Sequence, residues 1–172
     1  LDRILLTTED VSLREAAHRR ERAQALYAQG LFEHSPVSLW VEDFSRIRNL
    51  LEDLRSRHIV DLRVFMDVHP DFVRQCLNEI KVIDVNQATL DMFRAADRQT
   101  LLQNQHAIFR DDVEEHFREQ LIDLWEGRLF HSHEVMNYAL DGSERYVLLH
   151  FSVLPGHEHD WSLVLVSLTD IT

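Results

Sequence analysis

The C-terminal part of the chain restricts the possible folds more than any other part. Residues 129–140, 144–154 and 161–171 are rich in β-branched and other apolar residues, as β-strands are. The dipeptide Asp141-Gly142 separates the first two segments and is a strong signal for a tight hairpin turn. Three consecutive strands with short connections predict an antiparallel sheet, and other elements must cover at least one of its faces.

The preceding residues are mainly helical, with two short strands. The strand pattern occupies residues 37–42 and 80–85. Helical periodicity and capping signals occupy residues 12–29, 44–57, 62–66, 69–78, 86–94, 96–102 and 111–126. This order predicts an α+β fold with a five-stranded, mostly antiparallel sheet and its helices largely on one face.

Two regions add to this pattern. In residues 1–30, Ser12 and Glu15 have the spacing of a capping box and Gly30 is placed to stop a helix, which predicts a separate N-terminal helix. A domain covering residues 31–172 follows, with a helical insertion at about 44–79 after its first strand.

Composition limits the partners and the compartment. With 18 basic and 30 acidic residues the net charge is −12, which disfavours nucleic acid and direct membrane contact. Hydrophobic residues make up 45% of the chain, enough for a packed core. Cys76 is the only cysteine, so the chain has no internal disulfide. We therefore expect a cytoplasmic domain, whose parent protein could still be anchored in a membrane.

Three segments in the expected order resemble PAS sensory domains. They are Val82-Ile83-Asp84-Val85-Asn86-Gln87-Ala88, Ala139-Leu140-Asp141-Gly142 and a last strand that ends in Asp170-Ile171-Thr172. The resemblance is to the sensory-box type found in bacterial histidine kinases and diguanylate cyclases, and it covers about 31–172. The sequence departs from the usual PAS pattern at two places. One is the helical insertion at about 44–79, and the other is the absence of a common glycine around Met92-Phe93-Arg94, where a different backbone is expected.

The resemblance implies a regulatory module and not an enzyme. Such a domain senses a small molecule, or relays a conformational change, and acts on a C-terminal output domain, either a histidine kinase or a diguanylate cyclase. By resemblance, Thr169, Asp170 and Thr172 are the transmission residues. The sequence itself contains no glycine-rich phosphate loop and no metalloprotease or nucleophile-elbow motif.

A two-residue turn at Asp141-Gly142 would set the hairpin register and the candidate cavity. It places Leu140 opposite Ser143 and turns Glu134 toward the core, where a carboxylate needs a partner. That partner would be a ligand or an arginine, unless Glu134 is partly exposed. The predicted cavity residues are Trp40, Asn86, Phe117, Leu121, Glu134, Met136, Tyr138 and Phe151. The acidic Glu134 favours a small, partly apolar ligand that is neutral or cationic.

Cofactor and metal sites have weaker support. The same register places His131, His133 and His150 on one face, where they would either hold zinc or be half-exposed polar residues. Cys76 does not lie in the sequence context of a flavin photosensor. A haem would need an axial histidine such as His106 or His116, and both fit a structural role better. The cofactor therefore stays unknown.

The last strand is apolar on both sides, which predicts that both sheet faces are covered. The outer face would be covered by the N-terminal helix, by a second subunit, or by both, and we expect a homodimer. A ligand-free dimerisation and relay module is therefore the alternative to a sensor. A cavity filled by side chains would favour this alternative.

Overall fold

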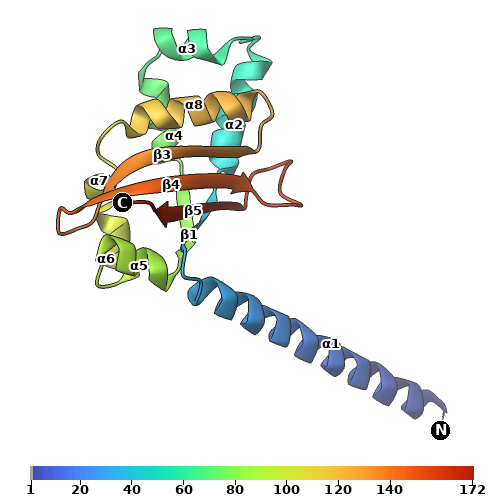
Figure 1. The fold of residues 1–172 in the computed structure, drawn as a ribbon. Helices are drawn as coiled ribbons and strands as arrows, with labels where there is room; N and C mark the ends of the chain where they lie inside the picture. The colour runs from blue at the N-terminus through green and yellow to red at the C-terminus, as the bar shows by residue number, and fades with distance from the viewer. Residues whose placement is uncertain (1) are drawn as a thin grey trace.

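The computed structural model describes the backbone of residues 2–172 and the side chains of residues 7–172. Its centre is a five-stranded sheet in the order β2-β1-β5-β4-β3, and every neighbouring pair is antiparallel. The strands are β1 (Ser38–Asp43), β2 (Lys81–Val85), β3 (Phe130–Tyr138), β4 (Glu144–Val153) and β5 (Val164–Asp170). The sheet and its helices confirm the predicted α+β class (Figure 1).

Seven helices follow β1 in the two long connections of the sheet. Between β1 and β2 lie α2 (Ser45–Ser56), α3 (Leu62–Val68) and α4 (Asp71–Asn78). Between β2 and β3 lie α5 (Gln87–Phe93), α6 (Arg98–Gln103), α7 (Gln105–Ile108) and α8 (Val113–Trp125). α8 packs on β3 and also contacts α3 and α4, so it joins the two helical groups.

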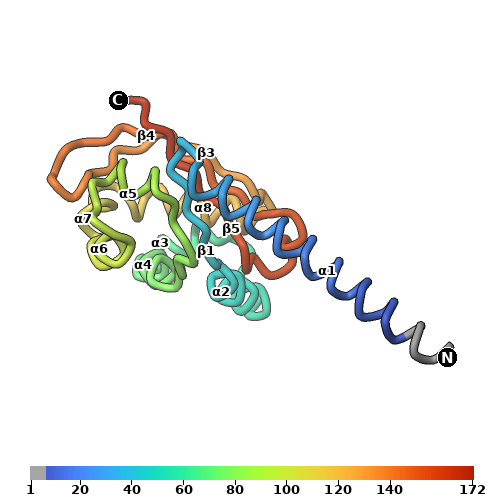
Figure 2. Tube along the Cα trace, turned by 90° about the horizontal axis from the view of Figure 1, so that it is seen from below, coloured from blue at the N-terminus to red at the C-terminus, as the bar shows by residue number. Residues whose placement is uncertain are grey.

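The N-terminal helix α1 (Asp2–Glu33) extends away from the body of the domain (Figures 1 and 2). The predicted helix ends at Ser12 and Gly30 are both wrong, because the helix passes through both residues. A single glycine lowers helix stability by about 1 kcal/mol but does not force an end. All described side chains of residues 7–29 are exposed, so α1 does not cover the outer face of the sheet in its own chain.

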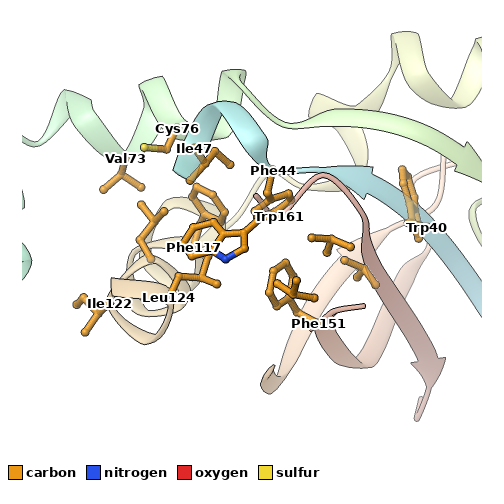
Figure 3. Packing of buried hydrophobic residues seen from close by; sticks show 14 of the residues in the cluster. Trp40, Phe44, Ile47, Val73, Cys76, Phe117, Ile122, Leu124, Phe151 and Trp161 are labelled. Carbon is orange, nitrogen blue, oxygen red and sulfur yellow. The ribbon is translucent and has the colours of Figure 1, made fainter. Parts of the chain in front are cut away.

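The main core lies between the sheet and α8. Phe117, Leu121 and Leu124 of α8 are buried against it, as the apolar periodicity of the helix predicts. The ring of Phe44 connects this helix with the sheet, because its centroid lies 6.3 Å from that of Phe117 and 5.1 Å from that of Phe151 (Figure 3).

The register of the β3–β4 hairpin differs by one residue from the prediction. Tyr138 pairs with Glu144, and the loop continues the pairing with a hydrogen bond from Ala139 N to Ser143 O of 2.8 Å. Three residues therefore form the turn, and its last residue, Gly142, has the positive φ of 86° that this loop type requires. A slip of one residue turns every side chain of β3 to the other face.

Although the chain lacks a common glycine around residues 92–94, Arg94 adopts the backbone conformation that a glycine favours. It has φ 53° and ψ 40°, the left-handed conformation that glycine favours, at the end of α5. Its guanidinium pairs with Asp141 in the hairpin loop, and Leu140 N donates to Phe93 O at 2.9 Å. The expectation of a different backbone here is wrong, since these contacts hold an arginine in the conformation.

No helix among the described residues is long and apolar enough to cross a lipid bilayer.

Candidate ligand-binding site

A cavity of about 330 Å³ lies between the core face of the sheet and helices α7 and α8. Its size is within the range of small-molecule sites. Its apolar wall consists of Trp40, Phe44, Leu77, Ile80, Phe109, Val113, Phe117, Val135, Leu149, Val166 and Leu168. Its polar side chains are Glu42, Asn78, Gln105, His106, Asp111, His116, Gln120, His133 and Asn137.

Aromatic rings form much of the wall. Trp40 meets Phe109 edge to face with centroids 5.6 Å apart, while Phe44 meets Phe117 in the same way at 6.3 Å. Trp40 stands apart from Phe44 and Phe117 along β1 (Figure 3). The cavity therefore has two aromatic groups in its wall, which suits an occupant with an apolar body.

Three buried polar atoms in this wall have no hydrogen-bond partner among the described residues. They are Nε1 of Trp40, Nδ2 of Asn137 and Nδ1 of His133. Trp40 and Asn137 are each only 2% exposed. An unpaired buried donor costs about 1–3 kcal/mol, so an occupant with a hydrogen-bond acceptor would gain by pairing with one of them.

Glu42 brings a carboxylate to the same cavity. It pairs with Val164 and lies two residues after Trp40, on the core side of β1. Burial raises the pKa of its carboxyl to about 7. Within the described part of the chain no basic side chain forms an ion pair with it, so the cavity presents an acid that changes charge near neutral pH.

A histidine cluster lies at the other side of the cavity. The rings of His116 and His133 stack, and the ring of His131 lies 5.0 Å from that of His133. Burial, together with the neighbouring His116 and His131, lowers the pKa of His133 to about 4. His116 Nδ1 lies 2.9 Å from Asp112 O, and His131 Nδ1 pairs with Asp123. His133 is therefore neutral over most of the physiological pH range.

The structure brings only part of the predicted set to the cavity. Trp40 and Phe117 line it, whereas Leu121 and Phe151 are buried in the core without lining it. Asn86 is fully buried and lies outside the wall. Its side chain makes five hydrogen bonds that join β1, α5 and the end of α1.

The placement of Glu134, Met136 and Tyr138 in the cavity is wrong. The one-residue slip moves all three to the outer side of β3. Glu134 is exposed and accepts a hydrogen bond of 3.2 Å from Tyr146 Oη. Tyr138 donates to Asp111 at 2.5 Å, so it contacts a residue of the cavity wall without lining the cavity itself.

The zinc arrangement is also wrong. His133 is opposite Leu149, and His150 is opposite Ser132, on the other face of the sheet. In residues 7–172 no group of three or more His, Cys, Asp or Glu side chains is arranged to hold a metal ion. His106 and His116, considered above as structural residues, both lie in the cavity wall.

Cys76 lies in the core and not in the cavity wall. Burial raises the pKa of its thiol to about 12, so it stays protonated and unreactive.

Glu42, Asn137 and His133 are among the cavity residues that sequence reasoning missed. Glu42 could have been found, because alternation from Ser38 through Trp40 places it on the core face. Asn137 and His133 required the three-residue turn, which Asp141-Gly142 alone does not distinguish from a two-residue turn.

Comparisons with known proteins agree with this architecture. A family model described as PAS fold matches residues 66–172. A search of curated proteins finds no match. The chain covers 64% of the length of one similar structure, an RsLOV variant.

Three further solved structures are similar in fold. The Rhodobacter sphaeroides LOV protein has a TM-score of 0.56 at 18% identity, covering 87% of this chain and 68% of that one. A domain of a sensory box sensor histidine kinase/response regulator from Geobacter sulfurreducens has a TM-score of 0.52 at 16% identity, covering 86% and 94%. The PAS domain of a LuxR-family transcriptional regulator from Burkholderia thailandensis, solved with ethanol, has a TM-score of 0.51 at 10% identity, covering 83% and 96%.

The family match covers more than half of the chain and includes β2, β3, β4, β5 and α8, while β1 precedes the matched residues. This chain belongs to the PAS family.

Proposed function

We propose that this PAS domain is the sensory part of a bacterial signalling protein and that it binds a small molecule in the cavity between the sheet and α8. The observation that carries the proposal is the set of unpaired polar atoms on Trp40, His133 and Asn137 in a cavity of about 330 Å³. A filled, ligand-free core would pair or replace such groups.

The route from the cavity to the C-terminal end is short. Val166 and Leu168 of β5 line the cavity, and Asp170 ends the same strand. Beyond it, Ile171 N donates to Tyr146 O at 2.8 Å and Thr172 Oγ1 accepts from Tyr146 N at 3.0 Å. A ligand that binds one arrangement of β5 more tightly shifts the population of that arrangement. We propose that Thr169, Asp170 and Thr172 transmit this change in β5 to the output domain.

The proposal includes a C-terminal output domain that the PAS domain regulates. A histidine kinase or a diguanylate cyclase is supported by the Asp-Ile-Thr ending and by the sensory box histidine kinase from Geobacter sulfurreducens. The ethanol complex of the Burkholderia thailandensis domain supports a small polar ligand. The free, buried thiol of Cys76 agrees with a cytoplasmic location. No catalytic activity is assigned to the domain itself.

The test is a thermal-shift screen of the 172-residue chain against neutral, cationic and anionic small molecules. Val166→Phe places a bulky ring in the cavity, and Leu165→Phe places the same ring on the outer face as its control. We expect hits that raise the melting temperature of the unmodified chain and of Leu165→Phe but not of Val166→Phe. A screen without hits, or hits that Val166→Phe retains, would favour the ligand-free relay.

A further inference from the structure

We propose that the cavity selects a small organic cation, an amine with an apolar body, whose ammonium group pairs with Glu42. This inference deepens the proposed function and rests on it. The cavity has three properties that together point to a cation, and each comes from different residues.

The first property is the sign of the charge in the wall. The acidic side chains there are Glu42 and Asp111, and among the described residues no lysine or arginine lines the cavity. The basic groups that remain are the imidazoles of His106, His116 and His133, and the last is held neutral by burial. An anion would meet two carboxylates and no fixed positive charge, whereas a cation would supply the ion-pair partner that the half-buried Glu42 lacks among the described residues.

The second property is the aromatic lining next to Glu42. Trp40 and Phe44 flank it on β1 and at the start of α2, and Phe109 and Phe117 add two further rings. Aromatic faces attract ammonium groups and also pack against apolar bodies. A carboxylate among aromatic rings recognises an amine with a hydrocarbon part better than a polar cation such as a metal ion.

The third property is the unpaired donors. Trp40 Nε1 and Asn137 Nδ2 belong to side chains that are only 2% exposed, and neither nitrogen has an acceptor among the described residues. An amine that also carries a hydroxyl, ether or carbonyl oxygen would fill this need. The preferred class is therefore an amphipathic amine with one acceptor oxygen.

Proton linkage gives this class a signature. The titratable groups that face the cavity are Glu42 on β1, His106 on α7, Asp111 before α8, His116 on α8 and His133 on β3. Glu42 with a pKa of about 7 is mostly protonated at pH 6 and mostly ionised at pH 8. A cation requires the ionised form, so its affinity should rise about tenfold between these pH values. A neutral ligand has no such requirement.

The experiment compares three probes with the same ring: 2-phenylethylamine, 2-phenylethanol and phenylacetate. Binding is measured by titration of ¹⁵N-labelled protein, following the indole Nε1–H of Trp40, which a Trp40→Phe variant assigns. The test variant is Glu42→Gln, which keeps the shape of the side chain and removes its charge. The matched control is Glu134→Gln, which makes the same change on the outer face of the sheet.

We expect the amine to bind about tenfold or more tightly than the alcohol and the acid. Glu42→Gln should lose that advantage and its pH dependence, while its affinity for 2-phenylethanol stays within about twofold, and Glu134→Gln should behave as the unmodified chain. If the alcohol or the acid binds as tightly as the amine, or if Glu42→Gln retains amine binding, the inference is overturned while binding in the cavity stands. If none of the three probes moves the Trp40 signal, the inference also fails. The screen with Val166→Phe then decides the proposed function separately.

Discussion

His116 on α8 and His133 on β3 stack face to face, with ring centroids 4.7 Å apart and planes 13° apart. The contact joins the long helix to the edge strand beside the cavity. Since two imidazolium rings repel at this distance, the contact is stable only while at least one ring is neutral. Burial, and after it the neighbouring His116 and His131, lowers the pKa of His133 to about 4, which keeps this ring neutral.

Acid should therefore loosen this contact. The pKa of His133 falls from 6.5 to about 4 on folding, so its contribution to stability is complete above pH 6.5 and is lost as the pH falls toward 4. His133→Phe keeps a stacked ring but cannot titrate, and it should remove about 2 kcal/mol of the acid-induced loss. Urea unfolding at pH 7 and pH 4 measures this. An equal loss in His133→Phe and in the unmodified chain would contradict it, and the exposed His159→Gln serves as the control.

Glu42 should act with the opposite sign. Its pKa rises from 4.5 to about 7 on folding, so its contribution favours the folded state at low pH and is lost as the pH rises through 7. Glu42→Gln should be more stable than the unmodified chain by about 2–3 kcal/mol at pH 8 and equal to it near pH 4.5. The free energy of unfolding across this pH range measures the difference. A variant that is less stable at pH 8 would show that Glu42 has a partner in the folded protein.

Asn86 should prove to be a structural residue. Its amide accepts from Leu39 N and Thr89 N and donates to the carbonyls of Phe32 and Val37. Asn86→Ala leaves these groups unpaired in a buried place and should cost about 3 kcal/mol or more. Affinity for a cavity ligand should change little. Thermal unfolding and probe titration separate the two effects, and a large affinity loss at unchanged stability would return Asn86 to the binding site.

Asp170 should matter more for transmission than for folding. Its carboxylate accepts from Thr172 N at 2.9 Å, and Arg145 lies 3.9 Å away. The hydrogen bonds from Thr172 lower its pKa. Because the site is exposed, Asp170→Ala should cost about 1 kcal/mol or less. Faster hydrogen exchange at Tyr146 N–H, which is bonded to Thr172 Oγ1, should accompany it. A loss of several kcal/mol would make Asp170 a folding residue.

We also propose a homodimer. α1 has the exposed apolar residues Leu13, Leu26, Tyr27 and Leu31, and the outer sheet face has Phe130 and Tyr146, which are 58% and 39% exposed. Because the side chains of residues 7–29 are all exposed, this part of α1 gains no stability from packing on its own domain, and a second copy would stabilise it. Deleting residues 1–29 should lower the dimer fraction in analytical ultracentrifugation. A monomer before and after the deletion would contradict the proposal.

The fold could be predicted from the sequence because its signals are local and repeated. The alternation in β4 placed Val147 and Phe151 on the core side correctly, and Asn86 caps α5 through Thr89 N as its position suggests. The cavity depended on a single loop length. Because the turn has three residues and not two, His133 and Asn137 lie on the core face of β3 in place of Glu134. The carboxylate that lines the cavity is Glu42, on β1. Local propensities do not determine which of two turn types forms, so the site could not be derived with the same certainty.

The pairing of β1 with β5 has a mechanical consequence. Ser38, at the start of β1, is opposite Leu168, near the end of β5, so the chain enters and leaves the sheet at neighbouring positions. The same two strands carry Trp40, Glu42 and Val166 of the cavity wall. Occupation of the cavity can thus move both connections at once, without a displacement crossing the domain. A ligand in the cavity would therefore act by changing the distance and the angle between α1 and the segment that follows Asp170.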